Sequence, residues 1–126
     1  MKQIKFTVLS KPVSVNSCYS QSLSGHRFMT NEGKQFKSDV AKAASPYSGI
    51  ILDTEKQKLS VSITYHFRTS LSDIDGSNKL VLDAMQGIFY KNDRQVQELH
   101  CFKFVDKESP RIEITIEEYK SKLSNL

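Results

Sequence analysis

The segment from Leu59 to Arg68 constrains the fold of this chain more than any other. Five apolar side chains alternate there with five polar ones: Leu59, Val61, Ile63, Tyr65 and Phe67 against Ser60, Ser62, Thr64, His66 and Arg68. Because successive side chains of a β-strand point to opposite faces, this alternation predicts a strand with one buried face. The chain is therefore expected to contain a sheet.

Three further segments are typical of strands. Residues 3–9 alternate polar and apolar side chains, residues 95–105 resemble a strand, and residues 110–118 carry isoleucine at every second position from Ile112. We expect the last two strands to form a hairpin around residues 106–110.

Two segments between these strands have helical spacing. Thr30 is suited to cap a helix that starts near Asn31 and ends at Ser45-Pro46. A second helix is predicted from about residue 77 to residue 89, where the apolar positions are Leu80, Leu82, Met85, Ile88 and Phe89. Residues 10–30 are rich in Ser, Asn, Gly and Pro and are expected to form a long loop, a kind of segment that is often functional.

The resulting order, β-α-β-α-β-β, predicts a single α/β domain with a mixed sheet and two main helices. A chain of 126 residues fits one domain, residues 1–126, with residues 119–126 as a polar, frayed tail. The composition is 38% hydrophobic and 25% charged, as in soluble globular proteins. No apolar run approaches the roughly 18 residues that span a bilayer, and the start lacks a signal peptide's apolar block. We therefore expect a cytoplasmic protein without a membrane partner.

The charges and the metal-ligating residue types narrow the function. Cys18, Cys101 and three scattered histidines show no zinc-site spacing. The net charge of +4 is compatible with a polyanionic partner. Lysine and arginine are spread along the chain, whereas several acids lie between residues 73 and 93. Positive surroundings around an acidic centre suit metal-dependent chemistry on DNA.

The acidic segment has informative spacing. Asp73 and Asp75 lie two apart just after a strand, so an extended backbone sends both carboxylates to one side. A helix that begins near residue 75 would stack Asp75, Lys79 and Asp83, which are four apart, on one face. Asp93 follows that helix and can return to the same end of the sheet. Neighbouring carboxylates repel one another, and oxygen-only ligands of this kind suit Mg²⁺, with Mn²⁺ as a substitute.

A plainer interpretation stays open on spacing alone. In it, Asp73 and Asp75 belong to a solvated turn, Asp75 or Ser77 is only an N-cap, and Asp83 simply pairs with Lys79. In the catalytic interpretation, Lys79 holds the scissile phosphate, orients the attacking water or stabilises the developing charge. The spacing does not choose between these three roles.

The same residues resemble a motif of the RusA family of Holliday-junction resolvases. That motif is Asp-apolar-Asp-Asn, a lysine three residues on, an aspartate four beyond that, and an aspartate before a short Gln-Val or Gln-Ile strand. It is matched here by Asp73-Ile74-Asp75, Lys79, Asp83, and Asp93 ahead of Gln95-Val96. The similarity extends more weakly over nearly the whole chain outside residues 72–96.

The resemblance implies a homodimeric, Mg²⁺-dependent endonuclease that resolves four-way DNA junctions by paired symmetric nicks in recombination and repair. It implies that Asp73, Asp75 and Asp93 bind the metal and that Lys79 is the catalytic lysine. Asp83 is either a support of the site or a structural partner of Lys79. Genes of this family are frequently carried by phages and prophages, so such an origin is also an expectation.

Two departures from the family motif stand out. Gly76 occupies the place of the usual Asn, which removes a side chain that would cap the helix or support Asp75, and glycine loosens the helix start. Asn92 stands where many members have an additional aspartate, which lowers the local negative charge. Both leave the principal catalytic positions intact, so activity is still expected.

Six residues are candidates for contacts with the DNA backbone or with unpaired bases at the crossover. They lie in the early loop, at the first helix, and beside the acidic segment: Asn16, Arg27, Lys34, Arg68, Lys91 and Arg94. For each of them, an ordinary solvated surface residue is the competing interpretation.

Two other functions compete with the nuclease. One is a dimer that binds branched DNA without cutting it, as a regulatory or architectural factor, although shape recognition alone does not require acids that face phosphates. The other is a metal-dependent phosphohydrolase of nucleotides. The lack of a Gly-rich phosphate loop and the basic surroundings argue against it, and no nucleotide cofactor is expected.

Overall fold

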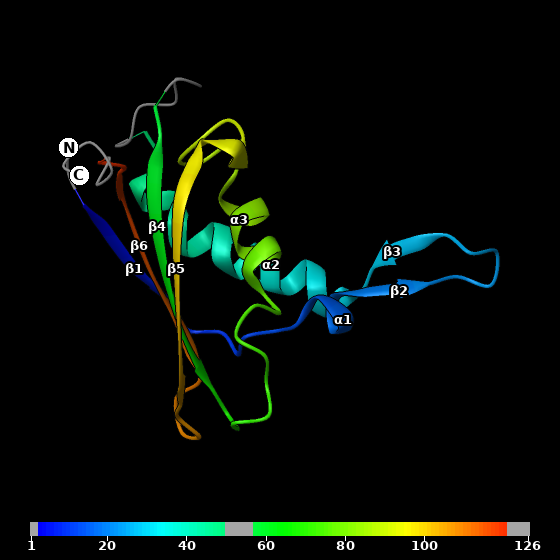
Figure 1. The fold of residues 1–126 in the computed structure, drawn as a ribbon. Coiled ribbons are helices and arrows are strands. Elements are labelled where there is room, and N and C mark those ends of the chain that lie inside the picture. The colour runs from blue at the N-terminus through cyan, green and yellow to red at the C-terminus, as the bar shows by residue number, and fades with distance from the viewer. Residues whose placement is uncertain (1–2, 50–56, 121–126) are drawn as a thin grey trace.

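The computed structural model describes residues 3–49 and 57–120 as one α/β domain (Figure 1). Four strands form a mixed sheet in the order β1-β6-β4-β5. Their bounds are Ile4–Val8 for β1, Leu59–Phe67 for β4, Val96–Val105 for β5 and Arg111–Glu118 for β6. The expected α/β class with a mixed sheet and few helices is confirmed.

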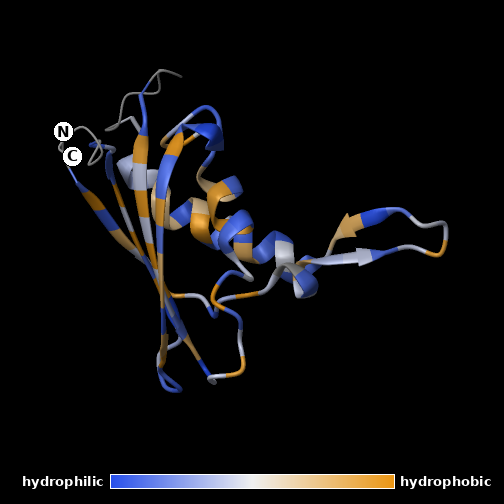
Figure 2. Ribbon diagram, in the orientation of Figure 1, coloured by the Kyte–Doolittle hydropathy of each residue, from blue (hydrophilic) through white to orange (hydrophobic). Residues whose placement is uncertain are grey.

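The two longer helices pack on one face of this sheet (Figure 1). They are α2, Asn31–Ala44, and α3, Asn78–Met85. The apolar residues of β4 point towards them and are buried, including Val61, Ile63 and Tyr65 at 0% exposure. Figure 2 shows the alternation of apolar and polar residues along the strands. The alternation predicted for residues 59–67 thus gives β4 one face that the helices cover and one face that they leave open.

The start of α2 is built as the sequence indicated. The Thr30 side chain accepts a hydrogen bond from the Gly33 N–H at 3.1 Å, and the helix ends at Ala44, before a 3₁₀ turn, η1, at Ser45–Tyr47. Gly33 has a packing reason, because a Cβ there would lie 2.7 Å from the Cys18 carbonyl oxygen. Only glycine lets this helix approach the preceding segment so closely.

The predicted hairpin of the last two strands is wrong. β4 lies between β5 and β6, pairing parallel with β5 and antiparallel with β6. A parallel neighbour needs a crossover connection, and α3 supplies it between β4 and β5. The chain then passes beyond β4, so that β6 enters between β4 and β1. The turn residues at 106–110 indicate that the chain reverses its direction there, but they do not indicate which strands pair with each other.

Two other expectations about the elements are corrected. Residues 10–30 contain the short helix α1, Val15–Cys18, and a hairpin of β2, Tyr19–Gln21, and β3, Arg27–Met29, so the order β-α-β-α-β-β was incomplete. The hairpin projects from the body of the domain (Figure 1).

The second predicted helix is shorter than 77–89. It stops at Met85 because Gln86 is extended and Gly87 adopts φ +88°. Phe89 lies in the turn that follows this helix, and its side chain is buried.

No helix among the described residues has the length and apolar content needed to cross a membrane. The strand β6 ends at Glu118, and the Tyr119 N–H donates to the Lys58 carbonyl at 2.9 Å. From residue 121 on, the predicted polar tail lies outside the described residues.

Candidate functional site

The connection from β4 to α3 carries two of the predicted acids. Asp73 and Asp75 are exposed there, in successive turns. The Asp73 carbonyl accepts from the Gly76 N–H and the Asp75 carbonyl from the Asn78 N–H, each at 3.4 Å. The spacing predicted that Asp75, Lys79 and Asp83 would share one helical face. The helix begins only at Asn78, so Asp75 lies outside it and this prediction is wrong. Asp75 therefore reaches the site from the turn.

Neither N-cap candidate caps this helix with its side chain. Ser77 stands at the N-cap position, but its hydroxyl donates to the Val13 carbonyl instead. Ser77 is 2% exposed, so this bond fastens the turn before α3 to the segment that leads into α1. The plainer interpretation is right in placing Asp73 and Asp75 in an exposed turn and in pairing Asp83 with Lys79, and it is wrong about a side-chain cap.

Lys79 joins two carboxylates that lie on different elements. Its Nζ is 2.7 Å from Asp93 Oδ2 and 3.0 Å from Asp83 Oδ1. The hydrogen bond to Asp93, followed by the one to Asp83, raises the pKa of the Lys79 ammonium above its ordinary value. The site therefore contains a fixed cation flanked by two anions.

A short 3₁₀ turn, η2 at Asp93–Gln95, presents Asp93. Asn92 caps it, its side-chain oxygen accepting from the Arg94 N–H at 2.9 Å. The Gln95 side chain is 2% exposed; its Oε1 accepts from the Lys91 N–H at 2.9 Å and its Nε2 donates to the Gln57 carbonyl at 3.0 Å. Asn92, a departure from the family motif, thus has a structural role, and Gln95 fastens the turn to the start of β4.

Asn78, at the start of α3, is contacted from β4 and β5. The Tyr65 hydroxyl donates to Asn78 Oδ1 at 2.6 Å, and the Cys101 thiol donates to the same oxygen at 3.5 Å. Burial raises the pKa of Tyr65, and the charges of Cys101 and Asp75 raise it further. The Tyr65 hydroxyl therefore keeps its proton and holds the Asn78 amide in one orientation beside Asp75.

Tyr90 has the matching position beside Asp83 and Asp93. Its hydroxyl donates to the Leu82 carbonyl at 2.6 Å. Burial, followed by the charges of Asp93 and Asp83, raises its pKa. Among the described acids of the motif, Asp83 and Asp93 contact Lys79, whereas the side chains of Asp73 and Asp75 form no hydrogen bond or ion pair with it.

The donor chemistry of the site fits Mg²⁺. Asp73, Asp75 and Asp93 offer only carboxylate oxygens, and the side chains of Asp73 and Asp75 take part in no hydrogen bond or ion pair with the described residues. Within residues 3–49 and 57–120, no three acid, histidine or cysteine side chains are gathered closely enough to hold an ion together. The assignment of these three aspartates as metal ligands remains a prediction.

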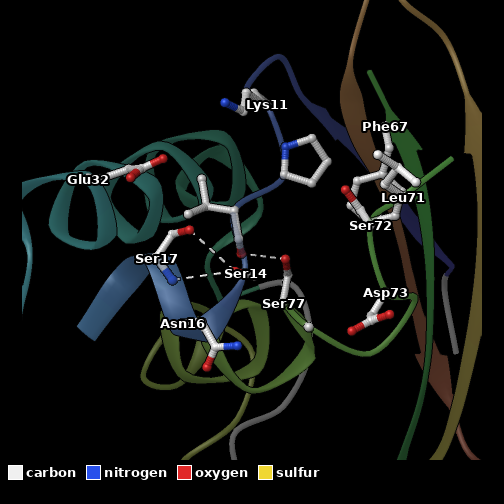
Figure 3. A pocket seen from close by; sticks show the side chains of 13 residues that line it. Lys11, Ser14, Asn16, Ser17, Glu32, Phe67, Leu71, Ser72, Asp73 and Ser77 are labelled. Carbon is white, nitrogen blue, oxygen red and sulfur yellow. Dashed lines mark hydrogen bonds between the residues drawn. The ribbon is translucent and has the colours of Figure 1, made fainter. Parts of the chain in front are cut away.

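Asp73 also lines a pocket of about 330 Å³, shown in Figure 3. The pocket lies between the loop that follows β1 and the loop that follows β4. Asn16, one of the predicted DNA contacts, is part of its lining.

The six predicted DNA contacts fall into separate places. Asn16 and Arg27 line a shallow groove at the hairpin, where the Arg27 guanidinium lies 4.2 Å from the centre of the Tyr19 ring. Lys34 is exposed in the first turns of α2, and Arg68 is exposed directly after β4. The remaining two, Lys91 and Arg94, are exposed on either side of Asn92-Asp93.

Sequence reasoning missed the residues that hold the acids in place. Tyr65 looked like an ordinary strand residue, and Asn78 was not singled out beside Lys79. Gln95 belonged to the motif, but its spacing gave no hint that it is buried and braces the turn of Asp93. Its place next to a required aspartate was the one signal that could have indicated such a role.

Comparisons with known proteins agree with the motif. A sequence model of the family described as "Endodeoxyribonuclease RusA" matches residues 10–117. A relative from Bacillus subtilis (strain 168), "Uncharacterized protein YqaN", is 29% identical over 140 aligned positions, which cover 94% of this chain and 98% of that protein. The range matched by the family model therefore spans all the acids and the lysine of the candidate site.

Proposed function

The chain belongs to the RusA family of endodeoxyribonucleases, and on that premise we propose that it resolves four-way DNA junctions by paired symmetric nicks. The observation that carries the proposal is the Lys79 ammonium, held between Asp83 and Asp93 while Asp73 and Asp75 sit on the adjoining turn. Acids and a lysine ammonium on neighbouring segments suit hydrolysis of a phosphodiester. DNA recombination and repair is the context in which such junctions arise.

In this proposal Asp73, Asp75 and Asp93 hold Mg²⁺, and Mn²⁺ substitutes for it. When bound, the ion supplies positive charge at the phosphate and makes water a better nucleophile at neutral pH. Lys79 contributes a second, protein-bound cation for the phosphate oxygens. Asp83 would keep that ammonium in place through its 3.0 Å contact, which does not depend on Asp93.

A homodimer is part of the same proposal. Two symmetric cuts in one junction call for two equivalent sites related by a two-fold axis. The exposed basic residues Arg68, Lys91 and Arg94 lie beside the acids in the chain and are suited to hold the backbone near the cut.

The test is cleavage of a labelled, mobile four-way junction in Mg²⁺ by wild type, Asp75→Asn and Asp39→Asn, with linear duplex as substrate control. Asp39 lies on α2, where it accepts a hydrogen bond from Gln35 at 2.8 Å. We expect paired symmetric nicks from wild type and Asp39→Asn, and a loss on the order of 10²–10³-fold for Asp75→Asn.

Two other outcomes of this experiment would contradict the proposal. Tight junction binding by wild type and Asp75→Asn, with no cutting in either Mg²⁺ or Mn²⁺, would identify a binding protein rather than a nuclease. Cutting by Asp75→Asn at the wild-type rate would remove Asp75 from the metal site. A dimer is checked separately by measuring the mass of the free protein in solution.

A further inference from the structure

The pocket beside Asp73 is bounded by two loops that are distant in sequence (Figure 3). Residues 11–14, 16 and 17 form one wall, and residues between 67 and 77 contribute the other. Glu32, from the first turn of α2, also lines it. Its volume of about 330 Å³ lies at the lower end of the roughly 300–1,000 Å³ of small-molecule pockets.

The walls of this pocket are held together without a ligand. The buried Ser77 hydroxyl donates to the Val13 carbonyl, and the Thr30 hydroxyl donates to the Ser17 carbonyl at 2.9 Å. A Cβ on Gly76 would lie 3.4 Å from the Cβ of Ser14, so the two loops lie close together at this point. The pocket is therefore preformed, which spares a ligand the cost of ordering it.

The lining combines apolar and hydrogen-bonding surfaces. Phe67 and Val13 are core residues at 5% and 7% exposure, whereas Leu71 is 89% exposed. Hydroxyl and amide groups come from three further lining residues, Ser14, Asn16 and Ser72. A flat heteroaromatic ring with polar edges matches such a lining.

The charges around the pocket discriminate between a base and a phosphate. Two carboxylates, Glu32 and Asp73, line it against one ammonium, Lys11. Without a bound metal ion, that balance disfavours an anion inside the pocket. Glu32, which is not one of the proposed metal ligands, favours a ligand that offers N–H donors. A carboxylate accepts well from the exocyclic amino group of a base.

We propose that this pocket receives one nucleobase of an unpaired nucleotide next to the cut, with Glu32 accepting a hydrogen bond from its exocyclic amino group. The proposal rests on the junction-cutting function above. Asp73 belongs both to the pocket and to the acidic site, so a base held here places the adjoining phosphate beside the acids. An unpaired nucleotide avoids most of the energy needed to extrude a base from a duplex.

Ser17 offers a matched pair of variants for the test. It is exposed, and its hydroxyl contacts the Ser14 hydroxyl at 3.4 Å. Ser17→Ala and Ser17→Leu both remove that hydroxyl, but only leucine fills the pocket. The substrates are four-way junctions in which a single abasic site is moved in turn through the nucleotides that flank the cut.

Binding affinity in EDTA and cutting rate in Mg²⁺ are measured for each junction. We expect an abasic site at one flanking position to weaken binding by wild type and Ser17→Ala on the order of tenfold. Ser17→Leu should bind the intact junction less tightly by a similar factor and should not respond to the abasic site. This non-additivity is the signature of a shared contact.

The two proposals fail in different ways. If abasic sites change the affinity of wild type at no position, the pocket proposal is overturned, whether or not the junction is cut. If wild type responds to the abasic site but cuts no junction, the pocket proposal stands and the nuclease proposal falls.

Glu32→Gln gives an independent readout where Ser17→Leu fails to fold. Wild type should prefer adenine, cytosine or guanine over thymine at the sensitive position. Glutamine offers thymine a donor, so Glu32→Gln should reduce that preference on the order of tenfold, whereas Glu117→Gln should preserve it. Glu117 is exposed on β6 and lies opposite Ser60 of β4. An unchanged preference in Glu32→Gln would overturn the role of Glu32.

Discussion

Among single residues, Lys79 is the one whose chemistry is set most directly by its neighbours. Its ammonium lies within 3.0 Å of a carboxylate oxygen on either side, and these contacts raise its pKa. A lysine with a raised pKa adds stability that is complete below the ordinary lysine pKa and is lost only as the pH rises through the raised value. Lys79 is therefore a constant cation at neutral pH.

Replacement of Lys79 by methionine should separate catalysis from stability. The side chain of Lys79 is 66% exposed, and such ion pairs contribute about 0–1 kcal/mol. We expect thermal unfolding within a few degrees of wild type, but a junction-cutting rate lower on the order of 10²–10³-fold. Single-turnover cleavage and a thermal melt provide the two measurements.

Two companion variants sharpen that experiment. Lys42→Met removes an exposed lysine from the last turn of α2 and should leave the cutting rate nearly unchanged. Asp83→Asn leaves the contact of Lys79 with Asp93 in place, so it should cost less activity than Lys79→Met. An Asp83→Asn variant as inactive as Lys79→Met would show that Asp83 does more than hold the lysine.

At the level of elements, the turn η2 depends on a side chain rather than on packing. Gln95 is buried, and its amide bonds the backbone at Lys91, Asn92 and Gln57. These bonds satisfy groups that would otherwise be buried without partners. The position of Asp93 is thereby tied to the strand β4 that leads into the other acids.

Gln95→Leu should therefore destabilise the fold and disturb the site together. Leucine has a similar size but leaves buried backbone groups unpaired, which costs about 1–3 kcal/mol. Urea unfolding should show that loss, and the cutting rate should fall as Asp93 moves away from Lys79. Gln97→Leu, on the exposed side of β5, is the control. Equal unfolding midpoints for the two variants would contradict this account of Gln95.

The elements themselves were predictable where their signals are local. The alternation along residues 59–67 and the cap at Thr30 correspond to β4 and to the start of α2. The end of α3 was misjudged because Ile88 and Phe89 continue the apolar spacing, whereas the positive φ of Gly87 has already turned the chain. A buried turn and another helical turn have the same hydrophobic pattern.

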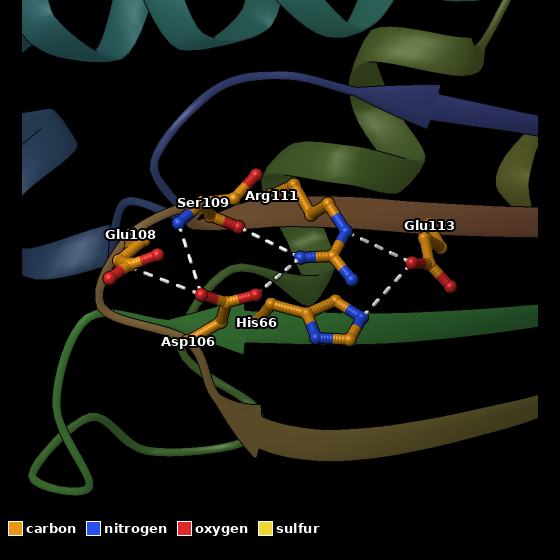
Figure 4. A network of polar contacts seen from close by, with 6 residues as sticks. All are labelled: His66, Asp106, Glu108, Ser109, Arg111 and Glu113. Atoms are coloured by element: carbon orange, nitrogen blue, oxygen red, sulfur yellow. Dashed lines mark hydrogen bonds and ion pairs between the residues drawn. The ribbon is translucent and has the colours of Figure 1, made fainter.

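For the whole molecule, the open face of the sheet carries an ion-pair network that joins three segments (Figure 4). Arg111 of β6 contacts Asp106 in the preceding turn at 2.9 Å and Glu113 at 3.1 Å. His66 of β4 lies 3.2 Å from the same Glu113. The hydrogen bond from Arg111, together with that from the Ser109 N–H, lowers the pKa of Asp106.

Arg111→Met should make the pH dependence of global stability shallower in acid. A carboxyl with a lowered pKa adds stability above its ordinary pKa and loses it as the pH falls through the lowered value. The variant should therefore unfold at a lower temperature than wild type at neutral pH, and the difference should shrink below about pH 4. Thermal melts at several pH values test this, and a gap that stays constant into acid would contradict it.

The sequence by itself predicted the four strands of the main sheet, the start of α2 and the residue types of the candidate site. Alternation and capping act between residues a few positions apart, so they are visible without a structure. The pairing of Lys79 with Asp83 is also a local interaction that the sequence predicts, because one helical turn separates the two residues. The family motif rests on such short spacings as well.

Only the tertiary structure decided which strands are neighbours and which distant segments are in contact. The parallel crossover through α3 sets β5 next to β4 and leaves β6 on the other side, against the hairpin that turn chemistry predicted. The same packing brings Asp93 to Lys79 across 14 residues and sets the loop at residues 11–17 against Asp73 to form the pocket. These contacts depend on how apolar faces are buried together, and periodicity within one segment carries no information about its partner.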